Sequence, residues 1–272
     1  MNHSSVSDIS QSIFNDIALI RASRPLIHNI TNFVVMNVTA NALLAIGASP
    51  IMAHASAELA ELISFSSALV LNIGTLDEAW INSMMLAAQL ASEKNKPIVI
   101  DPVGAGASQL RTQTVFKLLN NARVSVVRGN ASEVMALDQQ VSQIKGVDST
   151  EKSDRAIVAA KNISNQYHCV VVVSGETDYC VFEDHVFSVR NGSPMMTYVT
   201  GMGCIATALM GAFIAVNKDV LRATFHAMCC MGICGEIAAA ASNGPGTFLP
   251  QFLDALYRID LKMVSEKINA AM

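Results

Sequence analysis

Charged side chains are scarce in this sequence. Aspartate, glutamate, lysine and arginine make up 15% of the 272 residues and hydrophobic residues make up 51%, whereas about a quarter of a soluble domain is usually charged. Because this number of charged residues cannot cover the whole surface of the folded chain, we expect part of that surface to be buried against partner subunits in an oligomer. Basic runs and basic patches with interleaved aromatic residues are absent, and the net charge is −4. These features argue against nucleic-acid binding.

The sequence also lacks the marks of export, membrane insertion and structural zinc. Residues 1–12 are polar, with no basic segment before an apolar core, so we predict no signal peptide. The apolar run 205–216 is too short to span a bilayer, and His226, Glu236 and two glycines interrupt the run 224–241. We interpret both runs as buried core helices. The six cysteines lack the paired Cys-x-x-Cys spacing of zinc sites. A reduced, cytoplasmic protein without membrane contact is predicted.

Short β-rich runs alternate with longer helical patterns along the chain. The predicted strands span residues 26–29, 50–53, 68–73, 97–101, 124–127 and 169–173, and the predicted helices span 33–46, 56–65, 77–94, 154–166 and 204–216. This alternation is typical of an α/β fold with a parallel sheet covered by helices on both faces. Residues 179–182 and 185–189 predict an added hairpin, and the last seventy residues predict mostly helix. We expect one domain over residues 1–272, with roughly the first ten residues forming a loose N-terminus.

Polar residues and glycines follow the predicted strands. They occupy residues 28–29, 52–54, 72–75, 101–106, 128–130 and 174–176. In doubly wound sheets, ligands bind beyond the carboxyl ends of the strands. We therefore expect these residues to line one shared cleft.

The run YVTGMGCIAT over residues 198–207 predicts a glycine turn that leads into an apolar helix. Glycines let a ligand approach the backbone closely, and the first helical turn offers free N–H groups and the positive end of its dipole. The backbone of Gly201, Met202, Gly203 and Cys204 is therefore predicted to hold an anion, most simply a phosphate. We expect the same dipole to favour the thiolate of Cys204. A tight packing corner is the alternative explanation of this turn.

Two carboxylates are candidates for a magnesium site. Asp101 ends a predicted strand and precedes a glycine-rich loop, where a carboxylate can hold hydrated Mg²⁺. Glu133 lies in the first turn of a helix that opens onto the cleft, where it could face a second metal-bound water. Structural roles are the alternative, since Asp101 could cap its loop and Glu133 could form a capping box with Asn130.

Arg128 and Ser174 are candidates for binding phosphate. Arg128 lies at the end of a predicted strand, and its planar fork of donors suits a phosphate group. Ser174 also follows a predicted strand, and its hydroxyl can donate to a phosphate oxygen while Gly175 keeps the backbone close. An ordinary turn serine is the alternative at residue 174. The histidines show no metal-ligand spacing, so we predict no metal role for them.

Seven short segments of the chain, taken together, match one known family. They are HNITNFVV (28–35), GASPIMA (47–53), LVLNIGTL (69–76), IDPVGAGA (100–107), VRGNASE (127–133), SGE (174–176) and VTGMGC (199–204). With these segments the chain resembles the hydroxyethylthiazole kinase family of the ribokinase-like superfamily. The resemblance implies a mostly parallel central sheet with helices on both faces, in a single domain without a separate lid. It also implies a homotrimer whose thiazole pockets are completed between neighbouring subunits.

The same resemblance implies an activity. Members of this family use ATP and Mg²⁺ to phosphorylate the primary hydroxyl of 4-methyl-5-(2-hydroxyethyl)thiazole in thiamine salvage. Position by position, the resemblance gives these roles: Met52 and Gly201 in the thiazole site, Arg128 and Ser174 in the ATP site, Asp101 and Glu133 as the magnesium and phosphate-site acids.

At three positions the residue differs from the one usual in related kinases. Cys204 falls where most ribokinase-like sugar kinases have an aspartate base, which implies that it accepts the proton of the substrate hydroxyl. Met202 occupies the variable position of the Gly-x-Gly-Cys turn, where a small residue is usual. Ser174 stands where a threonine is frequent, and this exchange keeps the hydroxyl.

Other activities remain open at this point. The chain could be a related kinase acting on hydroxymethylpyrimidine or pyridoxal, or an ATP-dependent repair dehydratase for hydrated nicotinamide cofactors. It could also be an ATP-binding regulatory protein without turnover, in which case Asp101, Glu133 and Cys204 would be dispensable. A dinucleotide oxidoreductase is disfavoured, because no Gly-x-Gly-x-x-Gly follows the first predicted strand.

Overall fold

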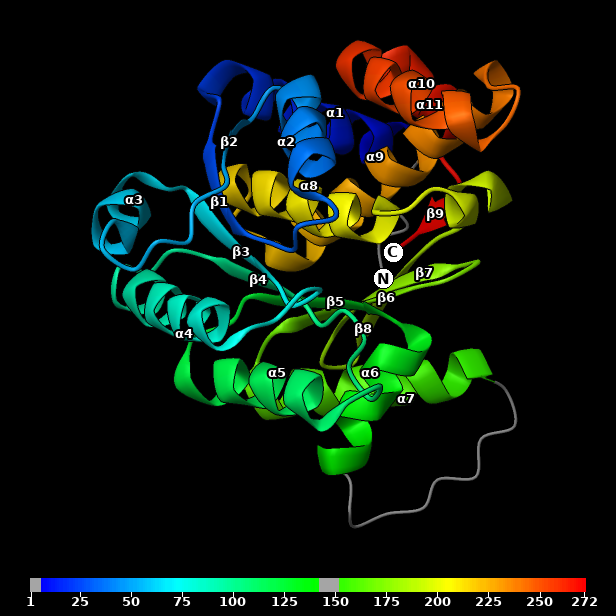
Figure 1. Cartoon of the computed structure of the whole chain (residues 1–272). Coiled ribbons are helices and arrows are strands. Elements are labelled where there is room, and N and C mark those ends of the chain that lie inside the picture. The colour runs from blue at the N-terminus through cyan, green and yellow to red at the C-terminus, as the bar shows by residue number, and fades with distance from the viewer. Residues whose placement is uncertain (1–5, 142–151) are drawn as a thin grey trace.

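Parallel strands form the centre of the computed structural model, which describes residues 6–141 and 152–272 (Figure 1). The strands are β1 (Leu26–Ile30), β2 (Ser49–Ile51), β3 (Ala68–Asn72), β4 (Ile98–Asp101), β5 (Val126–Asn130), β6 (Val170–Ser174), β7 (Asp178–Phe182), β8 (His185–Val189) and β9 (Ala270–Ala271). Their order in the sheet is β2-β1-β3-β4-β5-β6-β7-β8-β9. Strands β1 to β6 pair in parallel, and β7, β8 and β9 each run antiparallel to the preceding neighbour. The predicted hairpin is β7–β8.

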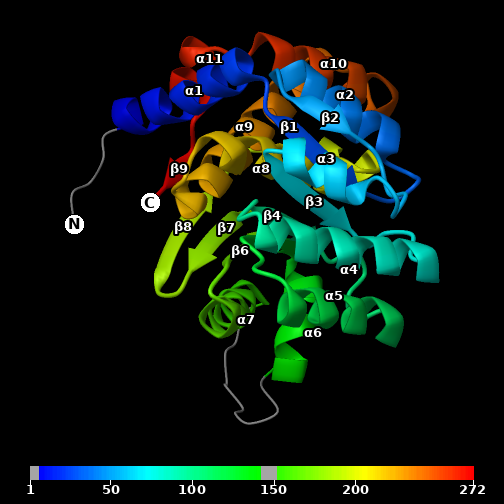
Figure 2. The same ribbon diagram turned by 90° about the vertical axis from the view of Figure 1, so that its left-hand side faces the viewer.

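Helices cover both faces of this sheet. One layer holds α1 (Val6–Ser23), α2 (Met36–Ile46), α8 (Met202–Val216), α9 (Val220–Ala241), α10 (Pro245–Arg258) and α11 (Leu261–Lys267). The other holds α3 (Leu59–Phe65), α4 (Glu78–Glu93), α5 (Gln109–Asn121), α6 (Ala131–Val141) and α7 (Lys152–Tyr167). Figures 1 and 2 show α8 and α9 on one side of the sheet and α4, α5 and α7 on the other. The predicted fold class is confirmed, and no separate lid occurs in the part of the chain that is described.

Alternation along the strands divides the hydrophobic core into two parts. In β5, Val126 packs into the core shared with α8, whereas Val127 packs into the core shared with α4 and α5. In β6, Val172 faces the first core and Val171 the second. Successive strand residues point to opposite faces, so a strand buried on both faces must be apolar throughout. This requirement explains the continuously apolar runs in the sequence.

The expectation of a loose N-terminus is wrong from residue 6 onward. α1 begins at Val6, and its residues Ile9, Ile13 and Ile17 are buried in the core. Their spacing of four places them on one face of the helix, so burial of that face fixes the segment. Residues 1–5 lie outside the described residues. α5 is a second helix that the sequence analysis did not predict.

α9 is the longest apolar helix among the described residues. It is long and apolar enough to cross a membrane, but 78% of its most apolar window is buried inside the structure. It packs between α8 and α10 and against the antiparallel end of the sheet. α9 is therefore a core helix, as predicted for residues 224–241.

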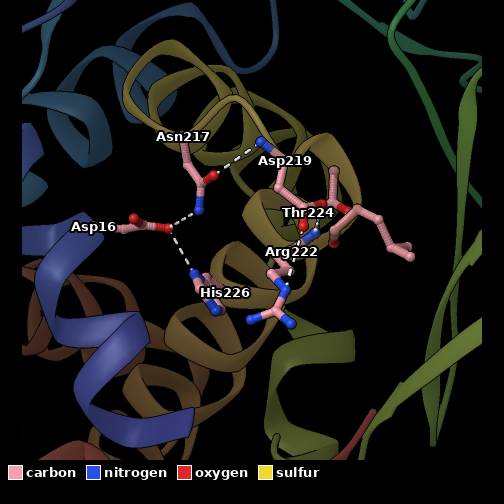
Figure 3. A network of polar contacts seen from close by, with 7 residues as sticks. Asp16, Asn217, Asp219, Arg222, Thr224 and His226 are labelled. Atoms are coloured by element: carbon pink, nitrogen blue, oxygen red, sulfur yellow. Dashed lines mark hydrogen bonds and ion pairs between the residues drawn. The ribbon is translucent and has the colours of Figure 1, made fainter. Parts of the chain in front are cut away.

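A buried polar network ties α1 to the connection between α8 and α9 (Figure 3). Asp16 of α1 lies 2.6 Å from Nδ1 of His226 and accepts a hydrogen bond of 2.8 Å from Asn217. Asn217 in turn accepts a bond from the backbone N–H of Asp219, which is the N-cap of α9. The network fixes the entry into α9 from the N-terminal helix.

Candidate active site

Side chains from the carboxyl ends of β3, β4, β5 and β6 meet the first turns of α8. Asp101 at the end of β4 contacts Thr207 of α8, and Arg128 of β5 lies against Gly203. Ser174 at the end of β6 contacts Arg128. The predicted site residues of these strands therefore come together at one edge of the sheet, as expected for parallel strands.

The Asp101 carboxylate is held by two buried side chains. Asn72, its register partner on β3, donates from Nδ2 to Asp101 Oδ2 at 2.9 Å. Thr207 donates from its hydroxyl to the same oxygen at 2.8 Å. All three residues are nearly inaccessible to solvent, with 1% of Asp101, 2% of Asn72 and none of Thr207 exposed. The sequence analysis included Asn72 among the residues expected to line the cleft but gave it no specific role, and it gave Thr207 no role.

An amide bridge links this carboxylate to the cysteine of the glycine turn. Asn32, just after β1, donates from Nδ2 to Asn72 Oδ1 at 2.7 Å and also lies 3.7 Å from the sulfur of Cys204. Four polar side chains from β3, β4, α8 and the loop after β1 thus form one connected unit around the cysteine.

The expectation that Cys204 favours its thiolate is wrong in this structure. Burial and, to a lesser degree, the negative charge of Asp101 raise the pKa of the thiol to about 11, although Asn72, Arg128 and Asn32 lower it. Cys204 does lie in the first turn of α8, which begins at Met202. Desolvation and a nearby carboxylate outweigh the helix dipole there, so the resting side chain is a neutral thiol.

Asp101 also has a perturbed pKa. Burial raises it to about 6, the nearby Arg128 and the Thr207 hydroxyl lower it, and the charge of Glu133 raises it. The negative charge of Glu133 thus acts on Asp101, and a cation bound near both carboxylates would offset it.

Glu133 forms the predicted capping box. Its backbone N–H donates to Asn130 Oδ1 at 2.9 Å, and its Oε2 accepts from the backbone N–H of Asn130 at 2.8 Å. Its other oxygen accepts from the backbone N–H of Gly104 at 2.8 Å. Glu133 therefore joins the start of α6 to the glycine loop that follows Asp101. Each oxygen has one bond to the backbone, and a carboxylate oxygen can accept a second from water.

The two carboxylates fit a hydrated Mg²⁺ better than a metal bound only by protein. No cluster of three or more His, Cys, Asp or Glu side chains suited to a metal occurs in the described ranges. Mg²⁺ usually keeps several waters and binds through one or two carboxylates and the phosphates of a substrate. The pair of Asp101 and Glu133 meets that description.

Arg128 lies inside β5 rather than at the end of the strand as predicted. β5 extends to Asn130 because its pairing with β6 continues to that residue. The Arg128 guanidinium donates to the Ser174 hydroxyl at 2.6 Å and sits beside Gly203 in the first turn of α8. Its Nε is buried and has no hydrogen-bond partner within the described structure. A buried unpaired donor beside a helix N-terminus suits an incoming anion.

The turn before α8 has the conformation expected of its glycines. Gly201 is the N-cap of α8 with φ +86°, a left-handed value that favours glycine. A Cβ at Gly201 would lie 2.9 Å from Cγ1 of Val35. The side chain of Met202 is buried in the hydrophobic core, so its size does not obstruct the backbone N–H groups of the turn.

Met52 lies apart from this cluster. It follows β2, three strand positions from β4, which is roughly 14 Å at the usual spacing between strands. Among the described contacts, none joins Met52 to Asp101 or Cys204. A thiazole-site role for Met52 therefore stays a prediction.

Arg111 is a further residue that the sequence did not reveal. Its guanidinium donates to the carbonyl oxygens of Ile73, Gly74 and Val103, which lie in the loops after β3 and β4. It thereby fixes the loops that follow Asn72 and Asp101. Arg111 was difficult to identify from the sequence, because it stands in a helix that the sequence analysis did not predict.

A pocket of about 440 Å³ lies elsewhere, before β5 and β6 and at the start of α9, lined by Arg123, His168 and Lys218 among others. It contains none of the predicted site residues. We therefore place the chemistry at the carboxyl ends of the strands and not in this pocket.

Comparison with known proteins agrees with the geometry. The hydroxyethylthiazole kinase family matches residues 17–262. A hydroxyethylthiazole kinase of Nitratidesulfovibrio vulgaris strain DP4 is 50% identical over 258 residues, which cover 95% of this chain and 97% of the relative. The solved structure of the hydroxyethylthiazole kinase protein from Pyrococcus horikoshii OT3 is 42% identical and has a TM-score of 0.90, with 96% of this chain and 98% of that chain covered.

More distant structures share the fold only. The pyridoxal kinase of Staphylococcus aureus in complex with AMP-PCP has a TM-score of 0.58 at 14% identity, with 78% of this chain and 88% of that chain covered. Family match, full-length relatives and site geometry agree. The chain belongs to the hydroxyethylthiazole kinase family.

Proposed function

We propose that this protein transfers the γ-phosphoryl group of ATP to the primary hydroxyl of 4-methyl-5-(2-hydroxyethyl)thiazole, as a step of thiamine salvage. The observation that carries the proposal is the position of Arg128, whose guanidinium lies against Gly203 at the N-terminus of α8, one residue from Cys204. A phosphoryl group there would meet the guanidinium, the free N–H groups of the helix and a side chain able to contact the acceptor hydroxyl. The names of the relatives supply the substrate class.

Phosphate binding rests on fixed donors. In this proposal, the backbone N–H groups of Gly201, Met202, Gly203 and Cys204 surround the transferring group, because the first turn of a helix lacks partners for them. Arg128 offsets the charge of the phosphates, and Ser174 orients its guanidinium. Such charge stabilisation is the main requirement of phosphoryl transfer, whose transition state is loose.

Cys204 is the proposed contact of the acceptor hydroxyl. Its pKa of about 11 keeps it neutral at rest, so only a small fraction is able to accept a proton at neutral pH. Acceptance of the hydroxyl proton by Cys204 is therefore proposed as a minor contribution to the rate. Orientation of the hydroxyl toward the phosphate is the larger one, since little bond formation precedes the transition state.

Asp101 and Glu133 would hold Mg²⁺ through its water shell. When bound, the ion would neutralise phosphate charge. Before it binds, Asn72 and Thr207 hold the Asp101 carboxylate, and Glu133 anchors the glycine loop through Gly104. The chain thus provides the two carboxylates in fixed positions.

A homotrimer is part of the proposal, with the thiazole pocket near Met52 and Gly201 completed by a neighbouring subunit. Three large apolar side chains beside the site support it: Phe33 is 61%, Val34 64% and Tyr198 76% exposed. Phe33 and Val34 follow Asn32, and Tyr198 precedes the glycine turn. Exposed apolar residues in one area indicate a surface that a partner covers. A location in the cytoplasm follows from the proposed metabolic role.

The test is an assay of the purified protein with ATP, Mg²⁺ and hydroxyethylthiazole, with hydroxymethylpyrimidine and pyridoxal in parallel. Formation of thiazole phosphate in clear preference supports the proposal. Preferred turnover of hydroxymethylpyrimidine or pyridoxal would instead identify the protein as a related kinase. ATP binding without transfer to any of the three would favour the regulatory protein or the repair dehydratase. Sedimentation of the same sample gives the oligomeric state.

A further inference from the structure

The Asp101 carboxylate is held asymmetrically. Asn72 and Thr207 both donate to Oδ2, at 2.9 Å and 2.8 Å. No amide or hydroxyl in the described part of the chain donates to Oδ1. Two bonds to one oxygen fix the rotation of a carboxylate and leave the other oxygen for a ligand. This arrangement differs from a salt bridge, in which the partner would neutralise the charge.

Asn72 is itself fixed in the orientation that this bond requires. Its Oδ1 accepts from the backbone N–H of Gly74 at 3.0 Å and from Asn32 Nδ2 at 2.7 Å. Two donors at Oδ1 determine which end of the amide is oxygen, so Nδ2 must point to Asp101. A Cβ at Gly74 would lie 2.6 Å from Asn32 Nδ2, so this glycine makes room for the amide.

Thr207 completes the arrangement from α8, which packs against β3 and β4. It stands one turn after Cys204 in α8 and is fully buried, and its hydroxyl also contacts the backbone oxygen of Gly203 at 3.2 Å. The same hydroxyl therefore links the carboxylate of β4 to the phosphate turn. The distance between Asp101 and the first turn of α8 is set by this contact.

We propose that Asn72 and Thr207 are positioning residues that fix the Asp101 carboxylate with Oδ1 free for the hydrated cation of the nucleotide. The inference rests on the proposed role of Asp101 toward Mg²⁺. Neither residue touches the reacting atoms. Each acts through Asp101, in the way that residues around a metal ligand orient it.

The decisive variant is Thr207→Val, because valine keeps the shape of the side chain and removes only the hydroxyl. We expect kcat and the affinity for Mn²⁺ to fall, on the order of 10–100-fold, which is typical of residues that orient metal ligands. The KM for the thiazole alcohol should stay unchanged. Thr207→Ser restores a hydroxyl and should recover most of both losses.

Thr114→Val is the matched control. Thr114 is also a buried helical threonine, but its hydroxyl bonds only to the backbone oxygen of Leu110 in α5. This variant should match the native protein in kcat and Mn²⁺ affinity. Binding of Mn²⁺ in the presence of a non-hydrolysable ATP analogue is measured by electron paramagnetic resonance, so one readout does not depend on turnover.

Asp101→Asn separates the positioning role from the proposed function. If Thr207 acts through Asp101, Thr207→Val should cause no further loss of Mn²⁺ affinity in the Asp101→Asn background, since coupled residues are not additive. The positioning role alone would be overturned if Thr207→Val had the same kcat and Mn²⁺ affinity as Thr114→Val while Asp101→Asn had lost both. Native Mn²⁺ binding and turnover by Asp101→Asn would overturn both the positioning role and the role of Asp101.

Asn72→Ala provides a second route to the same answer. It removes the other bond to Oδ2 and should also lower Mn²⁺ affinity, with circular dichroism used to check that the variant is folded. If this variant fails to fold, the Mn²⁺ affinity of Thr207→Val alone decides whether the bonds to Oδ2 position the carboxylate. A folded Asn72→Ala variant with native Mn²⁺ affinity would contradict the role of Asn72.

Discussion

The guanidinium of Arg128 fills the space beside Gly203 that a larger residue would need for its Cβ. An ideal Cβ on Gly203 would lie 2.6 Å from Arg128 Nη1, which is closer than side-chain contacts allow. The glycine is therefore required by a side chain of β5 and not by its own backbone conformation. This contact joins the strand edge to the phosphate turn.

Gly203→Ala should weaken ATP binding without destabilising the fold. The added methyl group displaces only the flexible end of Arg128, while alanine is the better helix former by about 0.5–1 kcal/mol. We expect the KM for ATP to rise on the order of tenfold, because one charged contact to the phosphate is worth about that much. Steady-state kinetics and thermal unfolding measure the two effects.

The control for this variant is Gly246→Ala. Gly246 is also the second residue of a helix, α10, but no heavy atom lies within 4 Å of the position of its Cβ. It should leave the KM for ATP unchanged. An unchanged KM in Gly203→Ala as well would show that Arg128 does not bind the nucleotide.

Cys204→Ala and Cys204→Asp test the proposed contact to the hydroxyl. With a neutral thiol at rest, loss of the side chain should lower kcat by no more than the lower end of the ~10²–10⁴ range of general-base catalysis. Aspartate is ionised at neutral pH, so Cys204→Asp should retain or raise kcat. Complete loss in folded Cys204→Ala would give the thiol a larger role. An inactive Cys204→Asp that still binds ATP would contradict the assignment of a base.

Alkylation measures the raised pKa of Cys204 directly. It is the one cysteine of six that is not fully buried. Its reaction with iodoacetamide at neutral pH should be slower than that of a free thiol and should accelerate as the pH rises toward 11. Because the charge of Asp101 contributes to this pKa, Asp101→Asn should speed the reaction at fixed pH, as followed by mass spectrometry. Equal rates would exclude that contribution.

Asp178→Asn should stabilise the protein at neutral pH. Burial raises the pKa of Asp178 from 3.8 to about 6, although the N–H of Gly175 and the charge of Arg128 lower it. The folded state therefore binds this proton more tightly than the unfolded chain. The resulting stability is full below pH about 4 and is lost as the pH rises through 6, by about 3 kcal/mol at most.

Urea unfolding across this pH range checks the prediction. Native protein and Asp178→Asn should have similar free energies of unfolding at pH 4, and the variant should be the more stable one at pH 7.5. Asparagine still accepts the bond from Gly175, so the loop before β7 is kept. The same difference at both pH values would show that Asp178 does not titrate in this interval.

Asp16→Ala should destabilise the fold without changing catalysis. It leaves His226 and Asn217 without their shared buried partner, and each buried polar group left without a hydrogen bond costs about 1–3 kcal/mol. Asp184→Ala is the control, since Asp184 is 97% exposed and pairs with Lys161 at 3.5 Å. An exposed pair contributes about 0–1 kcal/mol. Equal losses in the two variants would contradict the role of the network.

Several parts of the fold followed from local patterns. The strands β3, β4 and β6 were predicted within one residue of their bounds, because a buried parallel strand must be continuously apolar. The capping box between Asn130 and Glu133 was visible as a spacing of three. α1 was missed even though Ile9, Ile13 and Ile17 carry a helical spacing, because the polar residues between them concealed it.

The sequence by itself determined the layered α/β fold, the glycine turn and the residue types gathered after the strands. These depend on periodicity and backbone conformation, which act within a few residues. Only the tertiary structure decided that Cys204 is a neutral thiol, that Thr207 bonds Asp101 across 106 residues, and that Gly203 makes room for Arg128. Desolvation, charge proximity and steric exclusion depend on which distant groups pack together, and spacing along the chain does not specify that.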